Sequence, residues 1–286
     1  MSEKELSLQD IHQESVGLLK KLIEICDLLQ IDYFMAYGSL LGVVRHQGFI
    51  PWDDDTDVIM LRPAYDKFKK YCLENAQQLL PYKLMGWENT PDYPFTLWRF
   101  CDTRYRMESW DYSSAGMGLF VDIYCYDGAG NEQIPHNHPL RKKYTKLIKF
   151  AQLAQNPKFS PSTKGFLGNL VKFPAYLLAK IVGHRFFLKQ LETFKNAFSY
   201  EESTLLNSMV WDLSINSREK SWYEEYTLLP LNDIMVKVPK DYDTVLRCSY
   251  GDYMQLPPED KRTPSHGYRL YRKPEYFDEN GKLKET

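Results

Sequence analysis

The stretch GFIPWDDDTDVIM, residues 48–60, places four aspartates within five positions and continues directly into the apolar run Val58-Ile59-Met60. Two unit charges 4 Å apart repel by roughly 4 kcal/mol at an effective dielectric constant of about 20. Carboxylates this close together are therefore either solvated in a loop or gathered around a positive charge. The apolar run predicts a buried β-strand over residues 55–60, so the acidic residues are expected where a strand begins.

Strand geometry predicts how these acidic side chains are oriented. Alternate residues of a strand share a face, so Asp53, Asp55 and Asp57 are expected on one side, with Asp54 and Thr56 on the other. Residues on the same face lie about 6.6 Å apart at a rise of ~3.3 Å per residue. Carboxylates at that separation can lean together onto one Mg²⁺ ion, whose oxygen ligands lie at about 2.1 Å.

Three interpretations of the acidic cluster compete. A calcium-binding EF-hand loop opens with the same D-x-D-x-D pattern, but it requires Gly at its sixth and Glu at its twelfth position. Val58 and Ala64 occupy those positions here, which excludes the EF-hand. A solvated acidic turn without function and a divalent-metal site for phosphoryl or nucleotidyl transfer both remain open at this point.

The segment upstream favours the metal site. Gly38-Ser39 follows a strand predicted over residues 33–37 and opens a predicted helix, whose backbone N–H groups can bind a phosphate. Gly-Ser after one strand, followed by Asp-x-Asp on a second strand, resembles the arrangement of the nucleotidyltransferase fold.

The composition excludes several classes of protein. The chain has 286 residues, 43% of them hydrophobic and 26% charged, which is ordinary for a soluble globular protein. The net charge of −2 gives no indication of nucleic-acid binding. Five widely spaced cysteines without a C-x-x-C pair predict reduced thiols. The polar N-terminal segment does not resemble a signal peptide, and no run approaches the ~20 apolar residues of a membrane span, so we expect a cytoplasmic protein.

Helical and strand periodicities alternate along the chain and predict a mixed fold. Ser7 and Asp10 resemble a capping box at the start of the first helix. Helices are predicted at 8–30, 40–47 and 63–80, strands at 33–37, 55–60, 82–87, 95–102 and 118–126, and mainly helical structure at 139–200, broken by Pro157, Pro161 and Pro174. The segment from residue 229 onward is rich in Pro, Tyr and charge, and it is expected to be irregular.

The run YGSLLGVVRHQGFIPWDDDTDVIM, residues 37–60, resembles the signature of the LicD family of phosphotransferases. The segments GLFVDIYCYD and VPKDYDTVLRCSYGDYMQLPP and the histidine at position 266 are also similar to family segments. The resemblance implies an α+β fold in which a nucleotidyltransferase-type mixed sheet is flanked by helices. It predicts a catalytic core at 1–132, a basic, mainly helical insertion at 133–228, and a C-terminal segment at 229–286 that packs back on the core.

The resemblance also assigns roles to the acidic residues. The paired metal-binding acids of the family correspond to Asp55 and Asp57, with Asp53 as a further ligand, and the expected ion is Mg²⁺ or Mn²⁺. Asp122 matches a third acid on a neighbouring strand, as general base or metal ligand. An aspartate inside an apolar strand is costly unless it is paired or metal-bound. Thr56 departs from the family pattern, which usually has an aliphatic residue there.

Other polar residues are candidates for binding the donor or its phosphates, and each has a structural alternative. Arg45 and His46 could instead interact with the dipole at the C-terminus of a helix, and Arg99 could form a structural salt bridge. Trp52 could brace the loop, and a histidine such as His266 is usually just exposed. The candidates are Gly38, Ser39, Arg45, His46, Trp52, Arg99 and His266.

Together these features predict a metal-dependent phosphotransferase. The expected donor is a CDP-activated alcohol phosphate, with CDP-choline favoured, and the acceptor is a sugar hydroxyl of a cell-surface glycan, lipid-linked glycan or teichoic acid precursor, with release of CMP. A nucleotidyltransferase that uses an NTP and a metal-dependent glycosyltransferase are the enzyme alternatives. A membrane-binding scaffold without turnover is the non-enzymatic one.

Positive charge is concentrated in one part of the chain. Residues 133–191 contain eleven Lys or Arg and no Asp or Glu, so the rest of the chain sums to −13, since −2 = +11 − 13. Apolar stretches alternate with these cations, as in helices that lie on anionic membranes, where each Lys or Arg contributes about 1 kcal/mol. Peripheral contact with the inner face of the plasma membrane is therefore expected. A helical subdomain whose basic face turns to the acidic remainder and a site for an anionic polymer are the alternatives.

Overall fold

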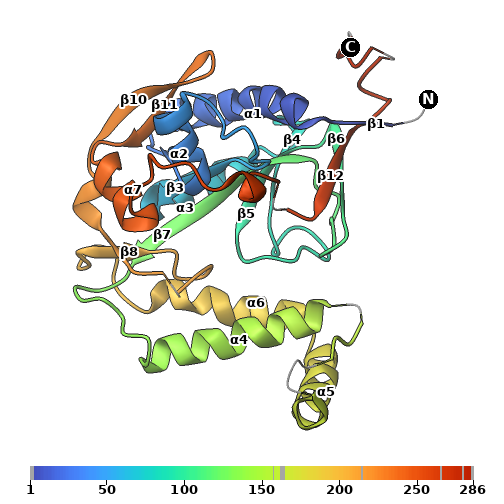
Figure 1. The fold of residues 1–286 in the computed structure, drawn as a ribbon, viewed down its shortest axis with the longest axis vertical. Helices are drawn as coiled ribbons and strands as arrows, with labels where there is room; N and C mark the ends of the chain where they lie inside the picture. Colours follow the sequence, from blue (N-terminus) through green and yellow to red (C-terminus); the bar gives the residue numbers. More distant parts are fainter. Residues whose placement is uncertain are drawn as a thin grey trace.

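The protein has a mixed α+β fold, as shown by a computed structural model (Figure 1). The structure describes residues 3–156, 158–161, 165–213, 215–264, 266–278 and 280–284. A sheet covered by helices forms the larger part, and a layer of helices lies beside it. Each part has its own hydrophobic core.

The main sheet is mixed and curled. Its strands lie in the order β2 (Phe34–Met35), β3 (Asp57–Leu61), β7 (Leu119–Gly128), β5 (Trp98–Asp102) and β4 (Tyr82–Met85). Only the pair β3–β7 is parallel among these neighbours. The far end of β7 also pairs with β8 (Leu205–Asn207), which in turn pairs with β9 (Arg218–Glu219).

Three helices from the first part of the chain pack against this sheet. The first, α1 (Leu8–Leu29), begins with the predicted capping box, in which the Ser7 hydroxyl accepts a hydrogen bond from the Asp10 backbone N–H. The second, α2 (Tyr37–His46), connects β2 to the acidic segment, and the third, α3 (Arg62–Glu74), carries Pro63 in its first turn. The predicted order of helices and strands up to this point is confirmed.

Several predicted boundaries are wrong. Strand β3 begins at Asp57, so residues 53–56 are irregular, because the Asp57 N–H donates to the Ser39 hydroxyl. The helix α3 ends at Glu74 instead of residue 80. The strand β6 (Tyr105–Ser109) was not predicted, because its alternation is short and polar.

The helical layer consists of α4 (Pro139–Gln155), α5 (Gly165–Val182) and α6 (His184–Glu192). In Figure 1, α4 and α6 lie side by side along the sheet-containing part, and α5 lies beyond them at the edge of the molecule. Of the predicted helix breaks, Pro161 lies between α4 and α5, Pro174 lies inside α5, and Pro157 lies outside the described residues. The expected break at Pro174 is therefore wrong.

Within the described ranges, none of the helices combines the length and the apolar character that crossing a membrane requires.

The C-terminal segment is more regular than expected. It contains a hairpin, β10 (Tyr226–Leu231) with β11 (Ile234–Pro239), the helix α7 (Tyr242–Tyr250), and β12 (Tyr268–Arg272). Strand β12 lies between β1 (Lys4–Glu5) and β6, so that both ends of the chain join one small sheet. Single 3₁₀ turns occur at η1 (Thr193–Asn196), η2 (Lys220–Tyr223) and η3 (Glu259–Lys261). The prediction of an irregular tail missed β12 because its partners, β1 and β6, are distant in the sequence.

Gly118, the residue before β7, lies against the turn between β5 and β6, and this close contact allows a prediction about stability. A Cβ atom at Gly118 would lie 2.0 Å from the Asp102 carbonyl oxygen and 2.7 Å from that of Tyr105. Because backbone atoms cannot move aside cheaply, we expect Gly118→Ala to lower the free energy of unfolding by about 1–3 kcal/mol. Gly17→Ala on α1, where no atom lies within 4 Å, should instead raise it by about 0.5–1 kcal/mol. Urea titrations of both variants test this, and equal effects would contradict it.

Candidate active site

A row of charged residues crosses three neighbouring strands. Asp57 on β3 is the register partner of Asp122 on β7, and Asp122 is the register partner of Arg99 on β5. Residues in register on adjacent strands project to the same face of a sheet. The three side chains therefore lie side by side, although they come from separate parts of the sequence.

Three carboxylates converge at one end of this row. Oxygen atoms of Asp55, Asp57 and Asp122 all lie within 4.8 Å of one another. Asp57 and Asp122 are only 6% and 4% exposed. The Oδ1 atom of Asp57 is buried and has no hydrogen-bond partner, which is unfavourable for a carboxylate unless a cation or proton occupies the centre of the group. The predicted grouping of these three acids is observed in the structure.

The start of α2 holds the acidic segment in place. The Ser39 hydroxyl accepts a 2.9 Å hydrogen bond from the Asp57 backbone N–H. An added Cβ at Gly38 would lie 2.5 Å from Asp53 Oδ2, so the Asp53 carboxylate occupies the space above this glycine. Gly38 and Ser39 therefore lie in the first turn of a helix as predicted, and there they face protein carboxyl and backbone groups. Phosphate binding by these two residues stays a prediction.

Burial and mutual repulsion disfavour the charged forms of the acids. Burial, together with repulsion from Asp53, raises the pKa of Asp55 from 3.8 to about 7. Burial and the neighbouring Asp55 raise the pKa of Asp57 well above its usual value, and burial followed by repulsion from Asp54 raises that of Asp53. In the absence of a cation, each of these carboxyls therefore keeps its proton to a higher pH than a solvated aspartate does.

Arg99 forms a buried ion pair with Asp122. Its Nε and Nη2 atoms donate to the two carboxylate oxygens, at 2.6 and 3.3 Å, and its guanidinium lies 3.9 Å from the ring centroid of Phe120. Arg99 therefore forms a structural salt bridge, which was the alternative to phosphate binding. A direct phosphate contact by this residue stays a prediction.

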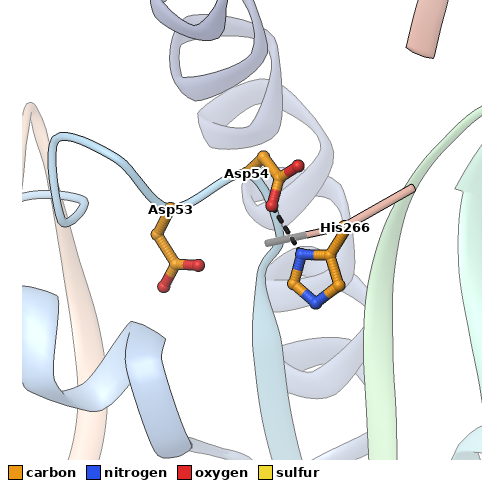
Figure 2. Close-up of side chains that lie close together, drawn as sticks. All are labelled: Asp53, Asp54 and His266. Atoms are coloured by element: carbon orange, nitrogen blue, oxygen red, sulfur yellow. Dashed lines mark hydrogen bonds and ion pairs between the residues drawn. The ribbon is translucent and has the colours of Figure 1, made fainter. Parts of the chain in front are cut away.

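A second acidic group lies beside the first and includes a residue close to the C-terminus. Figure 2 shows Asp54 and His266 turned toward each other, with Asp53 to one side. The His266 ring lies between two carboxylates, with Nδ1 2.5 Å from Asp54 Oδ1 and Nε2 3.3 Å from Asp55 Oδ2. The hydrogen bond to Asp54 raises the pKa of His266 to about 9, so the ring is an imidazolium at neutral pH.

Two other candidates line a pocket, and a third contacts one of them. Arg45 and Trp52 line a cavity of about 450 Å³. Arg45 donates a 2.8 Å hydrogen bond to the Tyr253 carbonyl, while its buried Nε has no partner. His46 lies edge-on to Trp52, with ring centroids 6.0 Å apart, and its buried Nδ1 is also without a partner. These unpartnered polar atoms make the cavity a candidate binding pocket.

Some residues of the site were missed by the sequence analysis. Asp54 was expected to face away from the other acids, but the irregular backbone turns it to His266, while the Tyr268 hydroxyl donates to its carbonyl oxygen at 2.6 Å. Tyr250 at the end of α7 also lines the cavity, where burial and the carboxylate of Asp57 raise its pKa. No local pattern marks Tyr250 or Tyr268 as site residues, since both are common aromatic residues far from residues 53–57.

The donor set fits a divalent metal ion. All the converging ligands are carboxylate oxygens, which Mg²⁺ and Mn²⁺ prefer. Arg99 neutralises Asp122, so Asp55 and Asp57 would offer a charge of −2 when ionised, and the unpartnered Asp57 Oδ1 supplies a free ligand atom.

Comparison with known proteins gives the family. A family model described as LicD/FKTN/FKRP, nucleotidyltransferase domain, matches residues 30–175. The chain belongs to this family, which confirms the resemblance of residues 37–60.

Individual relatives extend the similarity. The chain is 26% identical to the lipopolysaccharide cholinephosphotransferase LicD of Haemophilus influenzae, over 94% of this chain and 99% of that protein. An uncharacterized protein of Rickettsia typhi is 36% identical over 86 residues, or 30% of this chain and 23% of that protein. Another, of Rickettsia prowazekii, is 43% identical over 56 residues, or 20% and 18%.

The raised pKa values predict how stability depends on pH when a chelator removes divalent ions. The folded chain keeps the Asp55 proton up to about pH 7, whereas an unfolded chain loses it near pH 3.8. The folded state therefore binds more protons across this window, and stability falls as pH rises from about 4 to 7, by up to about 4 kcal/mol for this carboxyl. The stabilising charge on His266 is fully present below pH 6.5 and is lost as pH rises through about 9, so it acts in the same direction.

Urea unfolding at pH 4.5, 6 and 7.5 with chelator tests this dependence. Asp55→Asn should flatten the decline, because the amide has no proton to lose, while Asp92→Asn, an exposed residue with φ of +56° that asparagine tolerates, should leave it unchanged. A rise in stability over this range would contradict the protonated state of the acids.

The buried pair of Arg99 and Asp122 predicts a large loss of stability on breaking it. Arg99→Met leaves a buried carboxylate without its partner, and we expect it to lower the free energy of unfolding by about 3–5 kcal/mol. The double variant Arg99→Met/Asp122→Asn should recover part of this loss, because the uncompensated charge is gone. Arg106→Met, at an exposed ion pair with Glu3, should cost less than about 1 kcal/mol. If Arg99→Met lowers the free energy of unfolding no more than Arg106→Met does, a phosphate-binding role for Arg99 would be favoured.

Proposed function

We propose that the protein is a metal-dependent phosphotransferase that moves phosphocholine from CDP-choline to a sugar hydroxyl of a cell-surface glycan and releases CMP. The observation that carries this proposal is the convergence of Asp55, Asp57 and Asp122. It occurs in a chain similar over 94% of its length to a lipopolysaccharide cholinephosphotransferase. The proposal includes two variants of this reaction: the donor can carry a related phosphoalcohol in place of phosphocholine, and the acceptor can be a teichoic acid precursor. We also propose that the sheet-containing part has a nucleotidyltransferase-type fold.

Asp55, Asp57 and Asp122 would hold the ion, Mg²⁺ or Mn²⁺, with Asp53 next to them as a further ligand. When bound, such an ion neutralises the negative charge of a diphosphate and of the phosphoryl group in transfer. The low exposure of Asp57 and Asp122 limits access of water to this centre, which strengthens its electrostatic interactions.

The residues around the cavity would bind the donor. Arg45 and Trp52 border it, His46 lies edge-on to Trp52, and an arginine side chain with an unpartnered Nε is suited to bind a phosphate oxygen. The imidazolium of His266, held by Asp54, places a positive charge beside Asp55, where it can orient an anionic substrate group. Gly38 and Ser39 at the start of α2 would direct backbone N–H groups toward the same region.

Transfer requires a group that accepts the proton of the attacking hydroxyl. The bond from the acceptor oxygen to the choline phosphate forms as the bond to the bridging oxygen of the diphosphate breaks, and CMP leaves with that oxygen. Both oxygens of Asp122 contact Arg99, which favours the ligand role for Asp122 over a base role. Asp55 is less buried than Asp57 and Asp122, so a carboxylate oxygen of Asp55 that does not bind the ion would be better placed to accept the proton.

A turnover assay tests the proposal directly. The purified chain is incubated with Mg²⁺, a glycan acceptor and CDP-choline, CDP-ethanolamine, CDP-glycerol or CDP-ribitol, and CMP is quantified. We expect CMP release with one of these donors, loss with chelator, and a fall of at least ~10³-fold in Asp55→Asn and Asp57→Asn, because the charge on the transferring group is no longer neutralised. Asp92→Asn serves as the matched control with unchanged rate.

The products distinguish the alternatives. Release of diphosphate from an NTP would identify a nucleotidyltransferase, and transfer of a sugar from a nucleotide sugar would identify a glycosyltransferase. Turnover that survives Asp55→Asn/Asp57→Asn would contradict the assigned centre. A chain that folds and shows no turnover with any of these donors would favour the scaffold.

A further inference from the structure

The helix α5 exposes large apolar side chains along most of its length. Ile181 is 83% exposed and Val171 is 75% exposed, which is far from the burial expected of such residues in a packed helix. The exposed apolar residues of this helix are Leu170, Val171, Phe173, Leu177, Leu178, Ile181 and Val182.

These side chains share one broad face. At 3.6 residues per turn, they fall within an arc of about 180° around the helix axis, wider than the stripe of about 100° with which a helix packs against a core. No charged residue lies in this arc, and the buried Ala179 lies on the opposite side. The larger apolar face of α5 therefore points away from the protein, and in Figure 1 this helix lies at the edge of the molecule, beyond α4 and α6.

The neighbouring helices present positive charge. Lys142, Lys146 and Lys149 follow at helical spacing on the exposed face of α4, opposite the buried Tyr144. In α6, Arg185 and Lys189 are also exposed. Among the described residues, no carboxylate forms an ion pair with any of these five side chains, in agreement with the absence of Asp and Glu from residues 133–191.

We propose that α5 and the basic faces of α4 and α6 form a docking surface for an anionic lipid bilayer, with the apolar arc of α5 inserted at the level of the headgroups. The apolar arc matches the acyl region of the bilayer, and the unpaired cations beside it match the anionic headgroups. With its apolar arc on one side and the buried Ala179 on the other, α5 would lie in the interface plane, as amphipathic surface helices do.

Charge decides between this occupant and a second copy of the chain. Two copies that meet through this surface would bring together two sets of unpaired cations without one carboxylate between residues 133 and 191. Like charges across an interface are repulsive, and an apolar patch of a homodimer is normally rimmed by groups that pair. The surface therefore fits an anionic partner better than it fits itself.

Vesicle co-sedimentation tests the proposal with the chain of 286 residues and without any donor. We expect binding to vesicles of phosphatidylcholine with 30% phosphatidylglycerol and at least tenfold weaker binding to pure phosphatidylcholine. Leu177→Glu/Ile181→Glu should reduce partitioning at least tenfold, because two carboxylates enter the apolar arc. Lys146→Glu/Lys149→Glu should reduce it similarly, and 0.5 M NaCl should weaken the charge-dependent part. Equal binding to both vesicle types by the native chain would overturn the proposal.

Matched variants elsewhere on the surface control for general effects. Leu228→Glu/Met235→Glu changes two comparably exposed apolar residues of the β10–β11 hairpin and should bind vesicles like the native chain. Asp55→Asn should also retain vesicle binding, so failure of the proposed enzyme function and failure of the docking surface are distinguishable. Circular dichroism of each variant establishes that it is folded.

A site-specific label identifies the inserted helix. Cys248 is exposed and the other four cysteines are buried, so Cys248→Ser gives a background for labelling Leu177→Cys with an environment-sensitive dye. We expect a blue shift of its emission with anionic vesicles and none for the same label at Leu228→Cys. No shift at position 177 would overturn the proposal. A second result would also overturn it: the native chain sediments as a dimer, and Leu177→Glu/Ile181→Glu converts it to a monomer without changing vesicle binding.

Discussion

The mutual repulsion of Asp55, Asp57 and Asp122 is the constraint on which the structure of the site depends. The parallel pairing of β3 with β7 fixes Asp57 and Asp122 in register, and the protein opposes their repulsion only in part. Arg99 compensates Asp122, and His266 approaches Asp55 from the C-terminal segment. The remaining imbalance lies at the unpartnered oxygen of Asp57, which a cation or a proton would compensate.

Much of this centre could be predicted from the sequence. An Asp-x-Asp pair beside an apolar run and a lone Asp in a second apolar strand are recognisable, because charge in such strands requires compensation. The alternation of faces could not be extended to Asp53 and Asp54, since residues 53–56 are irregular. The alternation rule holds only where the backbone is extended.

Contacts made by distant segments could not be predicted. The short strands β6 and β12 have no strong alternation of their own, and their pairing depends on a partner far away in the chain. Tertiary context outweighs local preference in such strands. For the same reason, the roles of Tyr250 and Tyr268 became visible only in the folded structure, whereas the amphipathic helix α1 and its capping box are local features.

The hydrogen bond between His266 and Asp54 joins residues 212 positions apart. A ribosome that adds about 5–20 residues per second needs on the order of 10–40 s to synthesise that interval. During this time the acidic loop has already emerged, but the side chains that hold Asp54 do not yet exist. Completion of the site therefore waits until His266 has been synthesised, and a nascent chain passes through a stage in which its acidic loop lacks this partner.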